Sequence, residues 1–255
     1  MTAAMLAPEV GLTQRDSLLG LTNPLVKLGI ALAWLLGLGL TLDVRPPLIL
    51  ALVAIVAGLQ LGGVEVGTLA RRLAPLGLAA LGIATANLLF SVHNADPAAT
   101  ELLRLGPLRL TVEAVEGAAG LGARVASIIS VGAVFALTTD ATRLIDSLVQ
   151  LAHVSPRFAY GALAAYQAVP RLADDLATLR SARRLRGLRE WHPRLMFGLL
   201  VRAIRHADQL AIAMDARGFG SGPRSTYRPV AWTPLDAVVA AAGLGILIAA
   251  LLVSR

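Results

Sequence analysis

Five stretches of 15 to 20 residues contain no Asp, Glu, Lys or Arg: residues 28–42, 46–64, 73–92, 125–139 and 237–254. A membrane helix needs about 20 mostly apolar residues to cross roughly 30 Å of hydrocarbon. Apolar or small neighbours can lengthen the two shortest stretches, 28–42 and 125–139. A soluble helical bundle would need polar positions along each helix, and these stretches have almost none. The pattern therefore predicts an all-α, polytopic membrane protein with about five spanning helices.

Residues 140–228 follow a different pattern, because apolar positions at helical spacing alternate with arginines. The spacing predicts a short helix over 140–151 and a buried or interfacial helix over 158–170. Two amphipathic helices are expected next, one starting with Pro170 in its first turn and ending at Arg186, the other covering 195–217. The predicted organisation is a four-span transmembrane bundle (1–139), a helical region outside the membrane (140–228) and a C-terminal transmembrane helix (229–255).

Composition and charge agree with a membrane location. The 255 residues are 56% hydrophobic and 15% charged, whereas charged residues make up about 25% of an average soluble protein. Residues 140–228 hold 14 arginines against 7 acidic residues, which accounts for the whole formal charge of +7. Segments rich in Lys and Arg stay on the cytoplasmic side. We therefore expect a multi-pass protein of the cell membrane with 140–228 in the cytoplasm, the Arg71-Arg72 loop inside and 93–124 outside.

The two amphipathic helices end alike, with Leu179 and Arg186 in the first and Leu210 and Arg217 in the second, each arginine followed by glycine. Seven residues make about two turns, so each arginine lies on the apolar face that contains the leucine. Pairing with the helix dipole explains a terminal arginine and contributes only about 0.3–1 kcal/mol. It does not explain the placement on the apolar face, which favours insertion into acidic pockets of a partner. A structural role is expected for Arg180, Arg184, Arg189, Arg202 and Arg205.

Sequence motifs for catalysis are missing from the chain. The only lysine, Lys27, has no glycine-rich phosphate loop before it, and neither a zinc-protease motif nor a nucleophile elbow occurs. We therefore expect a non-catalytic subunit with no cofactor and no metal, whose energy comes from another chain. A self-contained permease or a membrane-embedded lipid-modifying enzyme are the alternatives, and each needs ionisable or clustered catalytic residues in or near the spans.

Three short motifs resemble those of the transmembrane T component of energy-coupling factor (ECF) transporters. Residues 22–28 (TNPLVKL) resemble that family's Asp-Pro-Arg-x-Lys-Leu motif, with leucine in place of its arginine. Residues 213–220 (AMDARGFG) look like its second Ala-Arg-Gly motif. Residues 182–187 (ARRLRG) resemble the first, usually Ala-Gln-x-Ala-Arg-Gly, so that either Arg183 or Arg186 could make the first contact; spacing and the following glycine favour Arg186. The similarity runs from Asn23 through the final span.

The resemblance implies a coupling subunit for vitamin or metal uptake. Its expected partners are two cytoplasmic ABC ATPases, a small membrane S component that binds the substrate, and membrane lipid, but no nucleic acid. The expected N-terminal motif residues are Asn23, Pro24 and Lys27. The expected ATPase contacts are Ala182, Arg183, Leu185, Arg186, Gly187, Ala216, Arg217 and Gly218.

Overall fold

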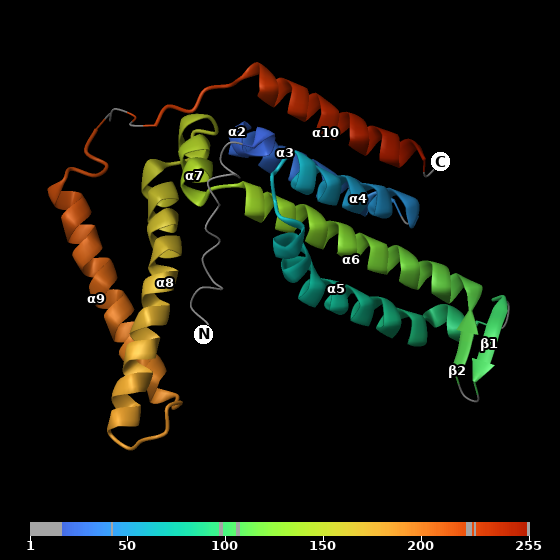
Figure 1. Ribbon diagram of the computed structural model, residues 1–255, viewed down its shortest axis with the longest axis horizontal. Helices are drawn as coiled ribbons and strands as arrows, with labels where there is room; N and C mark the ends of the chain where they lie inside the picture. Colours follow the sequence, from blue (N-terminus) through green and yellow to red (C-terminus); the bar gives the residue numbers. More distant parts are fainter. Residues whose placement is uncertain are drawn as a thin grey trace. The chain divides into compact units, whose positions relative to one another are not determined.

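The computed structural model describes residues 17–41, 43–96, 99–105, 108–222, 226 and 228–253 (Figure 1). These residues form two compact units. One, the coupling unit, is Ala141–Val230; the other, the membrane unit, contains the described residues up to Asp140 and from Ala231 onward. Each unit is described separately below.

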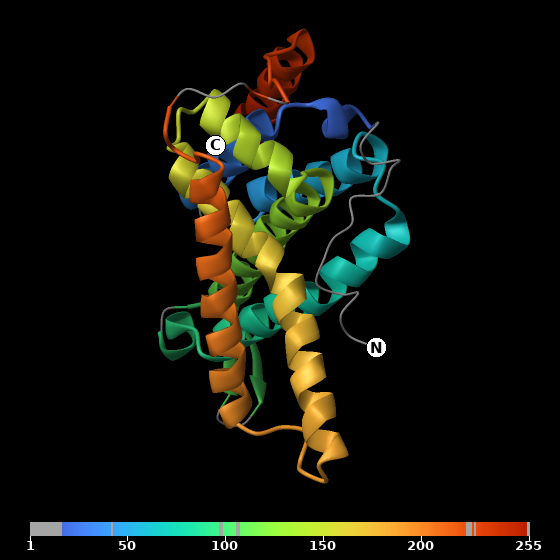
Figure 2. The same cartoon turned by 90° about the vertical axis from the view of Figure 1, so that its left-hand side faces the viewer.

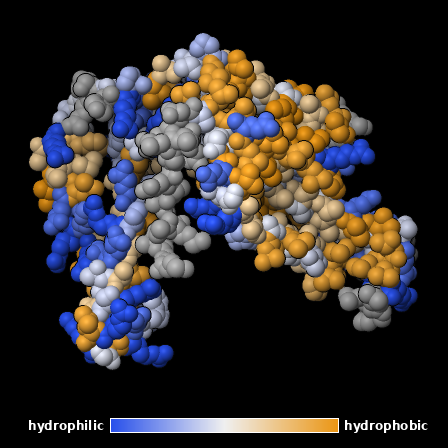
Figure 3. All heavy atoms as spheres, viewed as in Figure 1, coloured by the Kyte–Doolittle hydropathy of each residue, from blue (hydrophilic) through white to orange (hydrophobic). Residues whose placement is uncertain are grey.

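The membrane unit has six α-helices among the described residues: α2 (Leu18–Leu21), α3 (Pro24–Gly39), α4 (Arg45–Gln60), α5 (Val66–Leu89), α6 (Val112–Thr138) and α10 (Pro234–Leu252). The five predicted spans correspond to α3, α4, α5, α6 and α10. Helices α6 and α10, and α5 with its continuation to Asn94, are long and apolar enough to cross a membrane, while α3 and α4 are shorter apolar helices. Orange apolar atoms cover much of the visible face of this unit (Figure 3), as expected for a lipid-facing surface.

Close helix packing in the membrane unit depends on glycines. Helix α6 packs against α3, α4 and α5, and α10 packs against α3 and α4. A Cβ atom on Gly58 would lie 2.8 Å from Val134 of α6, and one on Gly37 would lie 2.6 Å from Leu247 of α10. Small residues at such contacts let membrane helices approach closely. The indole N–H of Trp34 adds a buried hydrogen bond of 2.9 Å to the carbonyl of Gly243.

The structure places a β-hairpin where the sequence predicted only a connecting segment. Strands β1 (Glu101–Leu105) and β2 (Leu108–Thr111) pair antiparallel after the short 3₁₀ helix η2 (Val92–Ala95). Helix α6 then begins at Val112, well before the predicted window at 125, because Thr111 accepts a hydrogen bond from the N–H of Ala114 and caps it. Charged and polar residues in this first part of α6 hid its helical character.

Two further sequence predictions were wrong in detail. Arg71 and Arg72 do not form a loop, since both lie in the first turns of α5 with exposed side chains. Long arginine side chains can extend from a helix toward polar surroundings, so they need not interrupt it. Pro170 does not begin a helix either, because it lies inside α8 (Pro156–Leu185). Pro170 is exposed, where water can satisfy the carbonyl that loses its partner.

The coupling unit contains α7 (Ala141–Gln150), α8 and α9 (Arg194–Ala216). Helix α7 agrees with the helix predicted over 140–151, and α9 agrees with the helix predicted over 195–217. Helices α8 and α9 run antiparallel and side by side, as both views show (Figures 1 and 2). Two contacts agree with the antiparallel course, because Asp175 pairs with Arg202 (2.7 Å) whereas the earlier Arg171 of α8 contacts the later His206 of α9. The unit is therefore a long helical hairpin preceded by a short helix.

Candidate functional site

The end of α8 is a well-formed Schellman turn. Arg186 follows the last helical residue with φ −88° and ψ 8°, and Gly187 has φ +70°. The N–H of Leu188 donates to the carbonyl of Arg183 over 3.1 Å, as this turn requires. Glycine adopts the left-handed conformation without steric cost, so the Arg-Gly pair defines where the helix stops.

The end of α9 repeats the same backbone turn. Arg217 has φ −90° and ψ 9°, Gly218 has φ +67°, and the N–H of Phe219 donates to the carbonyl of Met214 over 3.0 Å. The sequence repeat therefore encodes a structural repeat: an arginine at the cap, a left-handed glycine, then an apolar residue. Arg186 and Arg217 leave their helices at equivalent positions, and both residues are exposed.

The loop after α8 is fastened to the helix by arginines other than Arg186. Their contacts are a cation–π contact of Arg180 with Trp191 (5.3 Å), a hydrogen bond from Arg183 Nε to the carbonyl of Arg189 (3.0 Å) and an ion pair of Arg184 with Glu190 (3.2 Å). Among the described residues, no side-chain hydrogen bond or ion pair involves Arg186. Arg183 is half-buried and engaged within the chain, so the geometry favours Arg186 as the residue available to a partner.

The neighbours of Arg186 are also accessible. Ala182, Gly187 and Leu185 are exposed, and Leu185 has 88% of its surface accessible. The end of α8 therefore exposes an apolar side chain beside a guanidinium for which the structure describes no side-chain partner.

The end of α9 is anchored to the base of the hairpin. Phe219 packs edge-to-face on Tyr160 of α8, with ring centroids 6.5 Å apart. Arg157 Nη2 donates to the carbonyl of Gly220 over 3.1 Å. The Tyr160 hydroxyl donates to Asp146 of α7 over 2.9 Å. Burial, then the hydrogen bond and charge of Asp146, raise the pKa of Tyr160 above its ordinary value. These contacts hold the end of α9, which contains Ala216, Arg217 and Gly218, against α7 and α8.

Arg186 and Arg217 lie at opposite ends of the hairpin. Phe219 contacts α8 near its start, at Tyr160, whereas Arg186 directly follows the last residue of α8. At about 1.5 Å of rise per residue, the two arginines are roughly 40 Å apart. The structure therefore does not bring the two groups of predicted contact residues together into one site.

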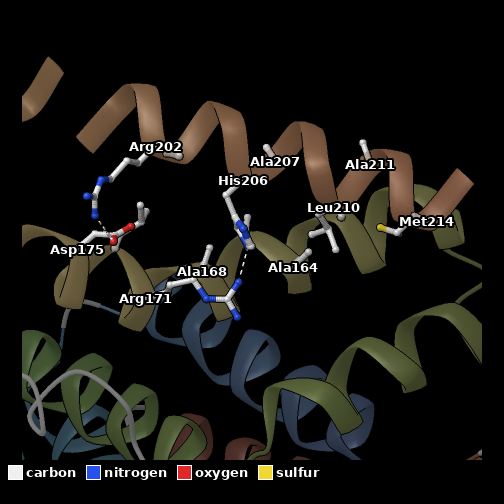
Figure 4. Close-up of a pocket in the computed structure, with 14 residues that line it drawn as sticks. Ala164, Ala168, Arg171, Asp175, Arg202, His206, Ala207, Leu210, Ala211 and Met214 are labelled. Atoms are coloured by element: carbon white, nitrogen blue, oxygen red, sulfur yellow. Dashed lines mark hydrogen bonds and ion pairs between the residues drawn. The ribbon is translucent and has the colours of Figure 1, made fainter. Parts of the chain in front are cut away.

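The space between α8 and α9 is mostly apolar (Figure 4). It forms a cavity of about 260 Å³ lined by small residues such as Ala164, Ala168 and Ala207. Arg171 contacts His206 across it, and Asp175 pairs with Arg202 at its edge. These contacts tie the two helices together along their length, so the hairpin can act as one element.

The N-terminal motif belongs to the membrane unit, whereas Arg186 and Arg217 belong to the coupling unit. Asn23 caps α3 by accepting the N–H of Leu25 over 3.0 Å, and Pro24 takes the first helical position. Lys27 is only 8% exposed, and its ammonium donates to the carbonyls of Leu19 (2.9 Å) and Thr138 (2.7 Å). The motif therefore joins α2, α3 and the end of α6.

Asp236 belongs to the same cluster, and the sequence analysis did not predict it as a site residue. Its Oδ1 accepts the backbone N–H of Asn23 over 2.7 Å, and its Oδ2 accepts the N–H and the hydroxyl of Thr233 over 2.8 and 2.9 Å. A threonine followed three residues later by an acidic residue, before an apolar run, is a capping-box pattern. That pattern would have placed Asp236 at the start of α10, but not its contact with Asn23.

Metal ligands do not gather anywhere in the part of the chain that the structure describes, since no three His, Cys, Asp or Glu residues are grouped so that they could hold an ion. The arrangement offers cationic and apolar contact surfaces at the ends of rigid helices.

Comparison with known proteins places this arrangement in a family. Residues 21–227 match the family CbiQ, cobalt transport protein. The chain is 28% identical over 176 residues to an energy-coupling factor transporter transmembrane protein of Heliobacterium modesticaldum, covering 62% of this chain and 66% of that protein. A similar protein of Listeria innocua is 28% identical over 155 residues, covering 54% of this chain and 58% of that protein.

A putative ABC transporter ATP-binding protein of Bifidobacterium longum is 30% identical over 174 residues, 60% of this chain and 22% of that protein. The matches thus span less than two thirds of each of these relatives. The family match covers most of the chain and includes both arginine motifs and the N-terminal motif. The chain therefore belongs to the CbiQ cobalt transport protein family, the transmembrane T components of energy-coupling factor transporters.

Proposed function

We propose that the chain is the coupling subunit of an ECF-type ABC importer. In this role it passes ATP-driven movement of two cytoplasmic ATPases to a separate membrane S component that binds a vitamin or a metal ion. The observation that supports this most directly is the pair of equivalent arginine caps at the two ends of one helical hairpin, Arg186 and Arg217.

Two ATPase copies suit this geometry. A single acidic pocket cannot hold two arginines that lie roughly 40 Å apart, whereas two copies of one protein can each hold one. Because both caps have the same backbone turn, two identical pockets can receive them. A guanidinium in such a pocket forms bidentate, charge-assisted bonds with carboxylates.

The charge distribution supports a cytoplasmic coupling unit. The excess of arginines in 140–228 is the signal that keeps a segment inside the cell. One relative is named for ATP binding, which is consistent with partners that supply the energy. We place ATP hydrolysis in those partners and assign no catalytic role to this chain.

The proposal is tested by purifying the complex from membranes in detergent. Arg186→Glu and Arg217→Glu should each reduce the amount of ATPase that copurifies, and the double variant should abolish it, while membrane insertion stays intact. Arg205→Glu is the matched control, because Arg205 is an exposed arginine of α9 and the change in charge is the same. Unchanged ATPase recovery with the double variant would refute the proposed role of the two caps.

A further inference from the structure

We infer that the N-terminal motif and Asp236 form a clamp that makes the membrane unit follow the movement of the coupling unit. This inference rests on the proposed coupling function. The coupling unit is inserted into the membrane unit, since the chain leaves after Asp140 and returns at Ala231. We call the group of Asn23, Lys27, Thr138 and Asp236 the junction clamp, because it holds the helices on both sides of this insertion.

The first arm of the clamp is the ammonium of Lys27. It donates to the carbonyl of Thr138, the last residue of α6, over 2.7 Å. The last carbonyls of a helix have no partner within the helix and carry partial negative charge. A buried ammonium therefore binds there strongly, and it fixes the point where the chain leaves the membrane unit.

The second arm is the carboxylate of Asp236. It is 1% exposed and accepts the backbone N–H of Asn23 over 2.7 Å. Its other oxygen accepts two hydrogen bonds from Thr233, at the start of α10. The same carboxylate thus caps α10 and binds it to α3, so the point where the chain returns is fixed as well.

Both arms start from one turn of α3. Asn23 and Lys27 are four residues apart, a spacing of about 6 Å along a helix axis. The end of α6 and the start of α10 are therefore held at a set separation by one short rigid element. With both points fixed, a force on the coupling unit moves the ends of α3, α6 and α10 together. With either arm broken, the end of α6 or the start of α10 can shift relative to α3.

The residue types fit this role. Lys27 is the only lysine of the chain, and every other basic residue apart from histidine is arginine. A compact ammonium can approach two carbonyls from within a packed core, whereas the wider planar guanidinium is shaped for carboxylates. The two arms also carry opposite charges, so the buried cluster as a whole is neutral.

Nucleotide-dependent hydrogen exchange tests the clamp in the complex of this chain with its ATPases. A non-hydrolysable ATP analogue should change amide exchange in 141–230 and also in the first turns of α3 and α10 and the last turn of α6. In Lys27→Met and Asp236→Ala, we expect the change within 141–230 to persist and the change in the membrane unit to be lost. A merely stabilising role would instead raise exchange equally with and without nucleotide.

Thr233→Ala serves as the control, because it removes one hydrogen bond to Asp236 while leaving the bond of Asp236 to Asn23. This variant should retain the nucleotide effect in the membrane unit. The inference is overturned if Lys27→Met and Asp236→Ala transmit the effect like the wild type. It is also overturned if nucleotide changes amide exchange in the wild type only within 141–230. That measurement does not depend on whether the variants fold. Absence of any ATPase in the wild-type complex would instead refute the proposed function.

Discussion

Arg183 and Arg186 provide a sharp test of how the end of α8 is used. In Arg186→Ala the free chain loses no side-chain hydrogen bond or ion pair that the structure describes, so its unfolding temperature should not change. In Arg183→Ala the hydrogen bond to the carbonyl of Arg189 is lost, which costs about 0.5–1.5 kcal/mol of local stability in the loop.

For ATPase binding we expect the opposite order of the two variants, with the larger loss in Arg186→Ala. Truncating one member of a charge pair buried in an interface costs about 2–5 kcal/mol, which corresponds to a loss of affinity of roughly 30-fold to several thousand-fold. We expect this loss for Arg186→Ala and a much smaller one for Arg183→Ala. Affinity is measured with the detergent-solubilised chain and purified ATPase, and stability by thermal unfolding of the chain alone. An affinity loss for Arg183→Ala that equals or exceeds that for Arg186→Ala would refute the reasoning.

Two further predictions concern packing and pH. Gly58→Ala should destabilise the membrane unit by about 1–3 kcal/mol, because the new Cβ meets Val134 at 2.8 Å; Gly39→Ala, at a position with no atom within 4 Å, should not destabilise it. Thermal unfolding in detergent compares the two, and equal losses would contradict the packing argument. The pKa of Tyr160 is higher in the folded chain than its unfolded value near 10.0, so the protonated hydroxyl stabilises the fold. This contribution is complete below the unfolded pKa and is lost as the pH rises through the folded pKa. The stability of the coupling unit should therefore fall above that pH, and less steeply in Tyr160→Phe, as followed by circular dichroism.

Hydrophobic pattern alone predicted the helices of the membrane unit because lipid demands long apolar segments with every backbone group paired. Extension of the 125–139 stretch over its small neighbours was expected, but the start of α6 at Val112 was missed because Glu113 and Glu116 interrupt the pattern. The break predicted at Pro170 was wrong because an exposed position tolerates the lost hydrogen bond.

The candidate site was predicted in part. Local signals, the Arg-Gly pairs, correctly indicated where α8 and α9 end, because a left-handed glycine acts on its own backbone. The separation of Arg186 and Arg217 depends on the antiparallel course of the hairpin, and the bond between Asn23 and Asp236 joins residues more than 200 positions apart. Spacing along the chain carries no information on either.

The unequal bracing of the hairpin has a mechanical consequence. The end of α9 with Arg217 is tied to α7 and α8 through Tyr160 and Arg157, while the described side-chain contacts beside Arg186 at the far end run to the loop that follows α8. Over a lever arm of roughly 40 Å, a tilt of about 10° about the base displaces the far tip by about 7 Å. The near tip hardly shifts. Under the proposed function, the two arginine ends would therefore move by different distances, and the two ATPases would act on parts of the hairpin of different stiffness.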